Sequence, residues 1–212
     1  ALGGQMGMTT DHTYLQMKML NTAKGPGVQC LRAQIDKLQY PLYMQKVLKQ
    51  QPHLKIIETM VKKLMIEGNC CHGIIDENGN KITSKTTILT TGTYLKANVL
   101  VGHEIIQEGP DHQRSAIGLS EQLKELGFQI LRLKTGTPPR IAKESIDFSQ
   151  CEIQLGSLGE YAFSYQTNTF IPVEKQLPCY LIHTQKETHE IIYKYLKESA
   201  MYSGNIKGKG PR

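Results

Sequence analysis

The chain has 212 residues, a net charge of +6, and 39% hydrophobic and 21% charged residues. This composition is ordinary for a globular protein, and no apolar run approaches the roughly 20 residues of a membrane span. The lysines are scattered, so the charge alone does not identify a polyanionic partner. Since the chain opens on Ala1 and closes on the glycine-rich "KGKGPR", we expect it to be a piece of a longer protein.

The cysteines and histidines favour no metal site. The five cysteines are odd in number and include no Cys-x-x-Cys pair, which argues against a disulfide framework and against zinc, and favours a reducing compartment. Four histidines lack the spacing of metal ligands and have no carboxylate partner that would mark a general base. These histidines are His103, His112, His183 and His189.

The amino-terminal part predicts a strand, a loop and a helix. In "YLQMKMLN", residues 14–21, apolar and polar residues alternate as in a half-buried strand. "TAKGPGVQCLRAQ", residues 22–34, is interpreted as a loop. Pro41 opens a predicted helix that ends at "QQP", with Leu42, Val47 and Leu48 as its buried stripe.

From Lys55 the pattern becomes that of short strands. The runs "KIIET", "VKKLMIEG", "CHGIIDENGNKIT" and "TTILTTG" are rich in β-branched residues. Asn78 and Gly79 form a strong hairpin signal. We therefore predict a small antiparallel meander followed by a buried strand over residues 86–92.

The next segment predicts a helix and a strand. In "SAIGLSEQLKELGF", four apolar residues share one helix face and Gly127 suits a carboxyl-terminal cap. These apolar residues are Ile117, Leu119, Leu123 and Leu126. "QILRL", residues 129–133, is a predicted strand, and a boundary between two parts of the chain is expected near Lys134.

The remaining residues predict two strands and a helix. "AFSYQT" and "LPCYLIHT" are the strands, at residues 162–167 and 177–184. "KETHEIIYKYLKES" is the helix, with Thr184 and Glu187 as a capping box.

Three loops are candidate binding sites. The run "ILTTGTYL" ends in Thr91-Gly92-Thr93, a small-residue turn through which a backbone can approach a cofactor phosphate or ribose. The stiff loop "LKTGTPPRI" places Lys134 and Arg140 on either side of two prolines, where they would hold an anionic group. Lys24, beside a Gly-Pro-Gly turn, would hold an anion or flank a flavin ring. For both basic loops a plain turn is the alternative, and the sequence contains no complete Gly-x-Gly-x-x-Gly fingerprint.

Several motifs together resemble those of the MnmG family, also called GidA, which comprises flavoproteins that modify the wobble uridine of tRNA. The motifs include "LNTAKGPGVQCLRAQIDK", "ILTTGTYL", "RLKTGTPPRI", "THEII" and "MYSGNIKGKGPR". The resemblance implies an α/β fold: residues 1–133 would form part of a glutathione-reductase-like FAD-binding domain with a small antiparallel β meander. Residues 134–212 would begin an inserted α+β domain that binds NAD and substrate.

The resemblance also implies cofactor-binding residues. Ala116 stands where many members have a serine that contacts FAD, and Ser115 precedes it. The carboxyl-terminal Gly-Pro-Arg matches the start of the family's nicotinamide-binding stretch. The implied cofactor-binding residues are Val61, Thr91, Gly92, Thr93, Ala116, Gly210, Pro211 and Arg212.

The implied function is that of a cytoplasmic enzyme. With the GTPase partner MnmE, a homodimeric family member would install an aminomethyl or carboxymethylaminomethyl group at carbon five of the wobble uridine, using FAD, NADH and methylenetetrahydrofolate. We expect the chain by itself to be inactive and without FAD, because the family's glycine fingerprint and catalytic cysteine lie outside it. The alternatives are a folate- and FAD-dependent tRNA uracil methyltransferase and a non-catalytic tRNA-binding module.

Overall fold

Two structural units each combine two segments that lie far apart in the sequence. The structure, a computed structural model, describes residues 4–206. Unit 1 comprises Ala1–Ile56 and Ile141–His183, and unit 2 comprises Ile57–Arg140 and Thr184–Arg212. These units do not follow the predicted division at residue 134, which concerns domains of a longer protein and stays a prediction.

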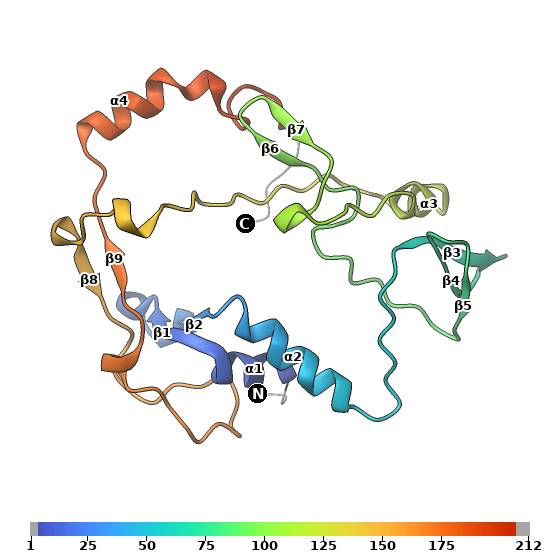
Figure 1. Ribbon diagram of the computed structural model, residues 1–212, viewed down its shortest axis with the longest axis horizontal. Helices are drawn as coiled ribbons and strands as arrows, with labels where there is room; N and C mark the ends of the chain where they lie inside the picture. Colours follow the sequence, from blue (N-terminus) through green and yellow to red (C-terminus); the bar gives the residue numbers. More distant parts are fainter. Residues whose placement is uncertain (1–3, 207–212) are drawn as a thin grey trace. The chain divides into compact units, whose positions relative to one another are not determined.

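Unit 1 contains two α-helices and two antiparallel strand pairs within the described residues (Figure 1). The first pair is packed by the helices, and the second comes from the later segment. The elements are α1 (Gln5–Thr13), β1 (Tyr14–Leu20), β2 (Cys30–Ile35), α2 (Gln39–Gln50), β8 (Glu152–Gln154) and β9 (Cys179–Leu181).

Both edges of β1 are hydrogen bonded. One edge pairs with β2 in antiparallel register. Along the other, the N–H of Met17 donates to the side-chain oxygen of Gln176 at 2.9 Å, and the N–H of Met19 donates to the hydroxyl of Ser157 at 2.9 Å. The N–H of Leu177 donates to the carbonyl of Leu15, also at 2.9 Å. The later segment therefore occupies the edge of β1 where another strand would otherwise pair.

Asp11 of α1 holds the later segment at a second point. Its buried carboxylate accepts hydrogen bonds from the N–H groups of Phe163 and Ser164, both at 2.9 Å, and from the hydroxyl of Thr167 at 2.6 Å. A buried carboxylate is stable only when such donors replace its water.

Unit 2 contains a three-stranded antiparallel meander, a short hairpin and two α-helices within the described residues (Figure 1). The meander has the strand order β3-β4-β5, and the hairpin pairs β6 with β7. The elements are β3 (Val61–Glu67), β4 (Cys70–Asp76), β5 (Lys81–Thr83), β6 (Val99–Val101), β7 (Glu104–Ile106), α3 (Leu119–Glu125) and α4 (Lys186–Lys194).

The core of unit 2 lies between β3 and α3. Leu64, Leu119 and Leu123 are buried together. The side chain of Gln122 accepts a hydrogen bond from the N–H of Leu64 at 2.7 Å and donates one to its carbonyl at 2.9 Å. Gln122 therefore bonds to β3 as a residue of a neighbouring strand would, which fixes α3 against the sheet.

The meander and its hairpin are confirmed. Asn78 and Gly79 lie in the turn between β4 and β5. The carboxylate of Asp76 accepts hydrogen bonds from the N–H groups of Asn78 and Asn80 at 2.9 and 2.8 Å, which closes this turn. The first predicted strand is also confirmed as β1, and part of the strand predicted at residues 177–184 is β9.

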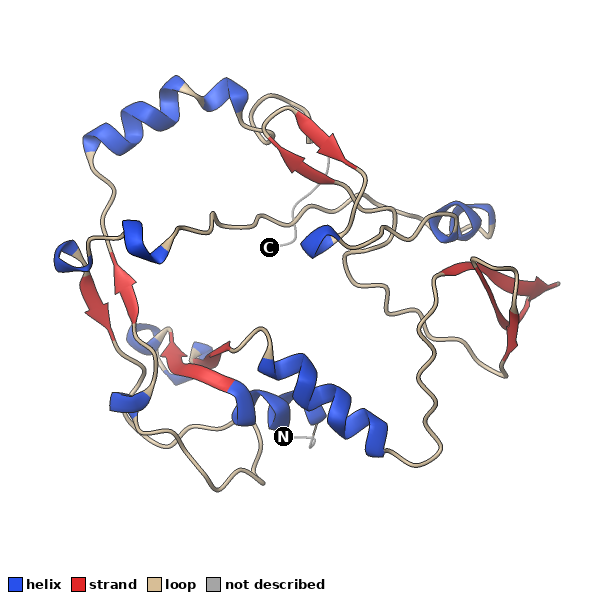
Figure 2. Ribbon diagram, viewed as in Figure 1, coloured by secondary structure: helices blue, strands red, loops and turns tan. Residues whose placement is uncertain are grey.

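Four predicted strands are wrong in this structure. Residues 55–59, 86–92, 129–133 and 162–167 are drawn as loops in Figure 2. A strand exists only where a neighbouring strand supplies a ladder of backbone hydrogen bonds, and no such ladder joins these segments to other residues of the described part of the chain. Their apolar side chains are accordingly exposed, and Ile88, predicted to be buried, is 86% accessible.

Five elements were missing from the prediction. Residues 30–34, interpreted as part of a loop, belong to β2, because β1 gives this segment a partner. The glycine-containing α1 has no buried apolar stripe to signal a helix. The hairpin of β6 and β7 and the short strand β8 also escaped the pattern analysis.

Three helix details differ from expectation. The capping box of α4 joins Gln185 and Thr188, one residue beyond the predicted pair. No residue of α2 is buried, because only α1 and the adjoining strands pack beside it in unit 1; Leu42 is 58% accessible. In α3, Leu119 and Leu123 are buried as expected, whereas Ile117 and Leu126, which lie just outside the helix, are exposed. The cap at Gly127 is confirmed by its N–H, which donates to the carbonyl of Lys124 at 2.9 Å.

None of the helices in residues 4–206 has the length and apolar composition needed to cross a membrane. All five cysteines are free thiols.

Replacing Asp11 by Asn should loosen the segment around Phe163. An amide has one acceptor oxygen and turns an NH2 group toward a donor, so part of the three-bond network is lost. Hydrogen bonds to charged groups contribute about 1.5–3 kcal/mol, so amide exchange in residues 161–167 should accelerate by about ten- to hundredfold. Hydrogen-exchange mass spectrometry of the full-length protein measures this, with the exposed Glu160→Gln variant as the control. Equal exchange rates in the two variants would contradict the role assigned to Asp11.

Candidate functional site

The predicted cofactor turn and Ala116 lie side by side in unit 2. Leu95, two residues beyond Thr93, forms a parallel bridge with Ala116. The N–H of Ala116 donates to the carbonyl of Tyr94 at 2.9 Å, and the N–H of Lys96 donates to the carbonyl of Ala116 at 2.7 Å. The structure therefore brings together two sites that are more than twenty residues apart in the sequence.

The turn itself can receive a ligand oxygen. Gly92 has a φ of 57°, a left-handed conformation that favours glycine. The carbonyl of Thr91 accepts from the N–H of Tyr94 at 3.3 Å, which closes the turn. The N–H groups of Gly92 and Thr93 have no hydrogen-bond partner within residues 4–206, and both residues are exposed. Two free backbone donors in one turn suit a phosphate or ribose oxygen.

Val61 belongs to the same neighbourhood through β3. It is the first residue of that strand, and Lys62 follows it. A Cβ on Gly118 would lie 3.2 Å from the carbonyl oxygen of Lys62, so the segment after Ala116 passes close to the start of β3. Three of the predicted FAD-binding elements, at Val61, Thr91–Thr93 and Ala116, are therefore gathered in unit 2.

Ser115, the residue before Ala116, is hydrogen bonded through its side chain. Its hydroxyl donates to the carbonyl of Tyr94 at 3.3 Å, and the backbone of Ala116 is already hydrogen bonded on both sides. A contact between Ala116 and a cofactor would therefore be apolar.

An ion pair lies next to this bridge. The ammonium of Lys96 donates a hydrogen bond to Glu121 of α3, and the hydroxyl of Ser120 donates another at 2.9 Å. These contacts, with Lys96 the larger cause, lower the pKa of Glu121 to about 2. Arg132 donates to the carbonyl of Lys96 at 2.7 Å. Glu121 is therefore ionised at neutral pH, and the pair links the loop of Lys96 to α3.

The two basic residues of the Pro-Pro loop differ in their surroundings. Lys134 is half-buried, and its ammonium lies 3.9 Å from the sulfur of Met201. Arg140 is exposed and has no hydrogen-bond or ion-pair partner within the described part of the chain. The loop contains no helix or strand. Arg140 is thus available to an anionic group.

The other predicted residues lie elsewhere. Lys24 is exposed and belongs to a short helical turn of unit 1, Thr22–Lys24. The N–H2 group of Asn21 donates to the carbonyl of Val28 at 3.1 Å, which closes the Gly-Pro-Gly loop on itself. Gly210, Pro211 and Arg212 lie outside the described residues.

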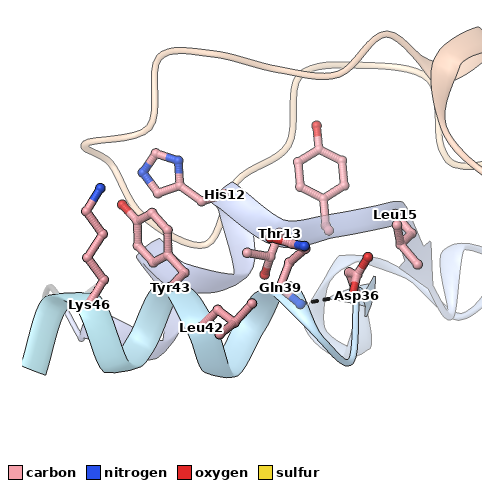
Figure 3. A pocket seen from close by; sticks show the side chains of 9 residues that line it. His12, Thr13, Leu15, Asp36, Gln39, Leu42, Tyr43 and Lys46 are labelled. Carbon is pink, nitrogen blue, oxygen red and sulfur yellow. Dashed lines mark hydrogen bonds between the residues drawn. The ribbon is translucent and has the colours of Figure 1, made fainter.

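Sequence reasoning missed a cavity in unit 1. It has a volume of about 430 Å³ and lies between the end of α1, the start of β1 and one face of α2 (Figure 3). Its lining residues are His12, Thr13, Tyr14, Leu15, Asp36, Gln39, Leu42, Tyr43 and Lys46. The signal was the spacing of Gln39, Tyr43 and Lys46, which places three polar side chains along one helix face. The apolar residues of the same helix, Leu42, Val47 and Leu48, predict a buried stripe instead.

Among residues 4–206, no group of His, Cys, Asp or Glu side chains could hold a metal ion. The sites available are thus the backbone turn of unit 2, the exposed Arg140 and the cavity of unit 1.

Comparison with known proteins assigns the family. The family described as "Glucose inhibited division protein A" matches residues 1–212. The tRNA uridine 5-carboxymethylaminomethyl modification enzyme MnmG of Bacillus licheniformis is 50% identical over 212 residues, which cover 100% of this chain and 33% of that protein. The enzyme of the same name from Bacillus subtilis is 48% identical over the same length. The chain spans about a third of the length of these curated relatives.

A solved structure agrees with the sequence comparison. Aquifex aeolicus GidA in the form I crystal superposes with a TM-score of 0.88 at 39% identity, over 100% of this chain and 36% of that one. Sequence and structure thus match along the whole length of the chain, which belongs to the GidA family.

Proposed function

We propose that the chain is part of an enzyme that installs an aminomethyl or carboxymethylaminomethyl group at carbon five of the wobble uridine of tRNA. The observation that supports this is the match of the whole chain to MnmG enzymes at 50% identity. The names of these relatives favour this reaction over uracil methylation. No feature of residues 4–206 favours a non-catalytic tRNA-binding module instead.

The proposal includes a role for this chain in binding FAD. The gathered elements at Val61, Thr91–Thr93 and Ala116 support it, because a turn with two free N–H donors suits a phosphate or ribose oxygen. When bound, FAD reduced by NADH would supply the redox chemistry, and methylenetetrahydrofolate would supply the one-carbon unit. The chain's own residues would bind and orient the cofactor.

The unpaired apolar segments support membership of a larger sheet. Three segments have strand-like sequences but pair with no strand within residues 4–206: residues 55–59, 86–92 and 129–133. They expose Ile56, Ile88 and Leu131. Exposed apolar segments of this kind gain free energy by pairing with further strands. We propose that residues 1–133 complete an FAD-binding domain with the rest of a longer protein, and that residues 134–212 belong to an inserted domain that binds NAD.

The partners belong to the proposal as well. tRNA would be the substrate, the GTPase MnmE would act jointly, and the full-length protein would form a homodimer in the cytoplasm. The chain alone would be inactive, since most of the enzyme's length lies outside it.

The reaction can be tested in cells. The full-length protein should restore 5-carboxymethylaminomethyluridine to the tRNA of a bacterial strain that lacks its own MnmG. Mass spectrometry of tRNA nucleosides measures the product, and the empty vector is the control. A protein that accumulates without restoring the nucleoside would refute the proposed reaction.

The flavin turn gives a sharper test. Gly92→Val places a β-branched residue at a positive φ, which costs about 1–3 kcal/mol of backbone strain and should distort the turn. We expect the affinity of the full-length protein for FAD to fall by about tenfold or more, measured by flavin absorbance after titration. The matched control is Gly79→Val: Gly79 also has a positive φ, and a Cβ there would have no atom within 4 Å, but it lies in the β4–β5 turn. Equal flavin binding by both variants would remove Gly92 from the cofactor site.

Arg140 gives a prediction about anion binding. We propose that Arg140 and Lys134 hold a phosphate of tRNA or of a cofactor. Arg140→Ala in the full-length enzyme should weaken tRNA or NADH binding by about 1–3 kcal/mol, as expected for loss of a charge-assisted hydrogen bond. Thermal stability should not change, because Arg140 has no partner within the described residues. Lys143→Ala is the control, and unchanged affinity for both ligands in a folded Arg140→Ala enzyme would disprove the role.

A further inference from the structure

The cavity of unit 1 has the size of a small-ligand site and lies apart in the sequence from the proposed flavin turn. Its volume of about 430 Å³ falls within the range of about 300–1,000 Å³ found for sites that bind small molecules. All of its lining residues come from positions 12–46, within one segment of unit 1. Its shape is therefore formed by α1, β1 and α2.

An aromatic pair lies at one end of the cavity. The rings of His12 and Tyr43 stack with centroids 4.7 Å apart and an interplanar angle of 28° (Figure 3). His12 is exposed, and Tyr43 is half-buried. Leu42 adds an apolar side chain beside them. Flat rings with an accessible face bind other planar rings by stacking.

A cation lies one turn further along α2. Lys46 follows Tyr43 by three residues, so both side chains project from the same face of the helix. Lys46 is exposed, and no carboxylate within residues 4–206 forms an ion pair with it. No carboxylate of the described residues therefore competes with an anionic ligand group for its ammonium.

A hydrogen-bonding edge lies at the other end. Asp36 accepts hydrogen bonds from the N–H groups of Leu38 and Gln39 at 2.8 and 3.0 Å, both through its Oδ1. These bonds fix the carboxylate at the start of α2, and its Oδ2 has no partner in the described part of the chain. The side-chain amide of Gln39 adds a donor and an acceptor beside it.

The order of these groups matches one class of ligand. Gln39 and Lys46 are seven residues apart, so the rise of an α-helix separates their backbones by about 10 Å, with Tyr43 between them. A ligand that uses all three has a polar edge, a planar ring and an anionic group in that order. A nucleotide has this arrangement: the edge and plane of its base, then its phosphate.

We propose that this cavity binds one nucleotide. The base packs against Tyr43 and His12 and donates an N–H to Asp36, and the phosphate lies against Lys46. A free mononucleotide and a nucleotide within a single-stranded RNA have the same chemistry, and either could supply it. The proposal rests on the cavity alone and does not depend on the tRNA reaction proposed above.

The test uses the full-length protein with any flavin it carries. Guanosine monophosphate and a short single-stranded oligoribonucleotide are titrated separately by calorimetry, with flavin absorbance followed in parallel. Lys46→Gln removes the charge and Tyr43→Leu removes the ring. The matched control is Lys49→Gln, on the same helix and exposed, but outside the cavity lining.

We expect binding of at least one probe, weakened about tenfold by Lys46→Gln and about tenfold by Tyr43→Leu, and unchanged by Lys49→Gln. Binding of guanosine monophosphate identifies a free nucleotide as sufficient, whereas binding of the oligoribonucleotide alone identifies RNA as the source.

The proposal is overturned if neither probe binds, if either cavity variant behaves as Lys49→Gln does, or if the probe displaces flavin. Because Lys46 is exposed, its replacement tests the site even if Tyr43→Leu does not fold. A protein that restores the tRNA nucleoside but binds neither probe overturns this proposal and leaves the tRNA reaction standing.

Discussion

Every strand in this chain depends on a partner for its backbone hydrogen bonds, and the supply of partners decides which apolar runs become strands. β1 has partners along both edges: β2 on one, and on the other the side chains of Gln176 and Ser157 together with backbone from the later segment. β3 has β4 on one edge and the amide of Gln122 beside Leu64. In both places, side chains complete an edge that would otherwise be open, and thereby tie distant segments to the sheet.

The same constraint explains the exposed apolar segments. Ile56, Ile88 and Leu131 lie in runs whose composition is that of strands, yet none of these runs pairs with a strand among the described residues. Composition sets a preference of about 1 kcal/mol at most between residues in a strand, and it cannot replace a missing ladder of hydrogen bonds. Unpaired runs of this kind are expected in a chain that spans about a third of its relatives' length.

The groups suited to ligands are of two kinds. In unit 2 they are backbone donors in a turn, positioned by the bridge between Leu95 and Ala116 and by the ion pair of Lys96 with Glu121. In unit 1 they are side chains along one face of α2, with Asp36 held in place by the first N–H groups of that helix. A backbone turn can bind any ligand oxygen of suitable geometry. A set of side chains instead selects a ligand by its ring, its charge and its hydrogen-bonding edge.

The sequence by itself determined some of the local elements and the family. The Asn-Gly turn, the alternation in residues 14–20 and the cap at Gly127 are set by neighbouring residues, and ordered motifs along the whole chain identified the GidA family. Only the tertiary structure decided that residues 30–35 are a strand, that Asp11 binds the segment around Phe163, and that Ala116 adjoins the turn of Thr91–Thr93. It also decided the cavity between α1 and α2, which pattern analysis of single elements missed. The physical reason is the same in each case, because these features depend on groups that come from different elements. Local propensity contains no information about which distant group will supply a hydrogen bond or line a cavity.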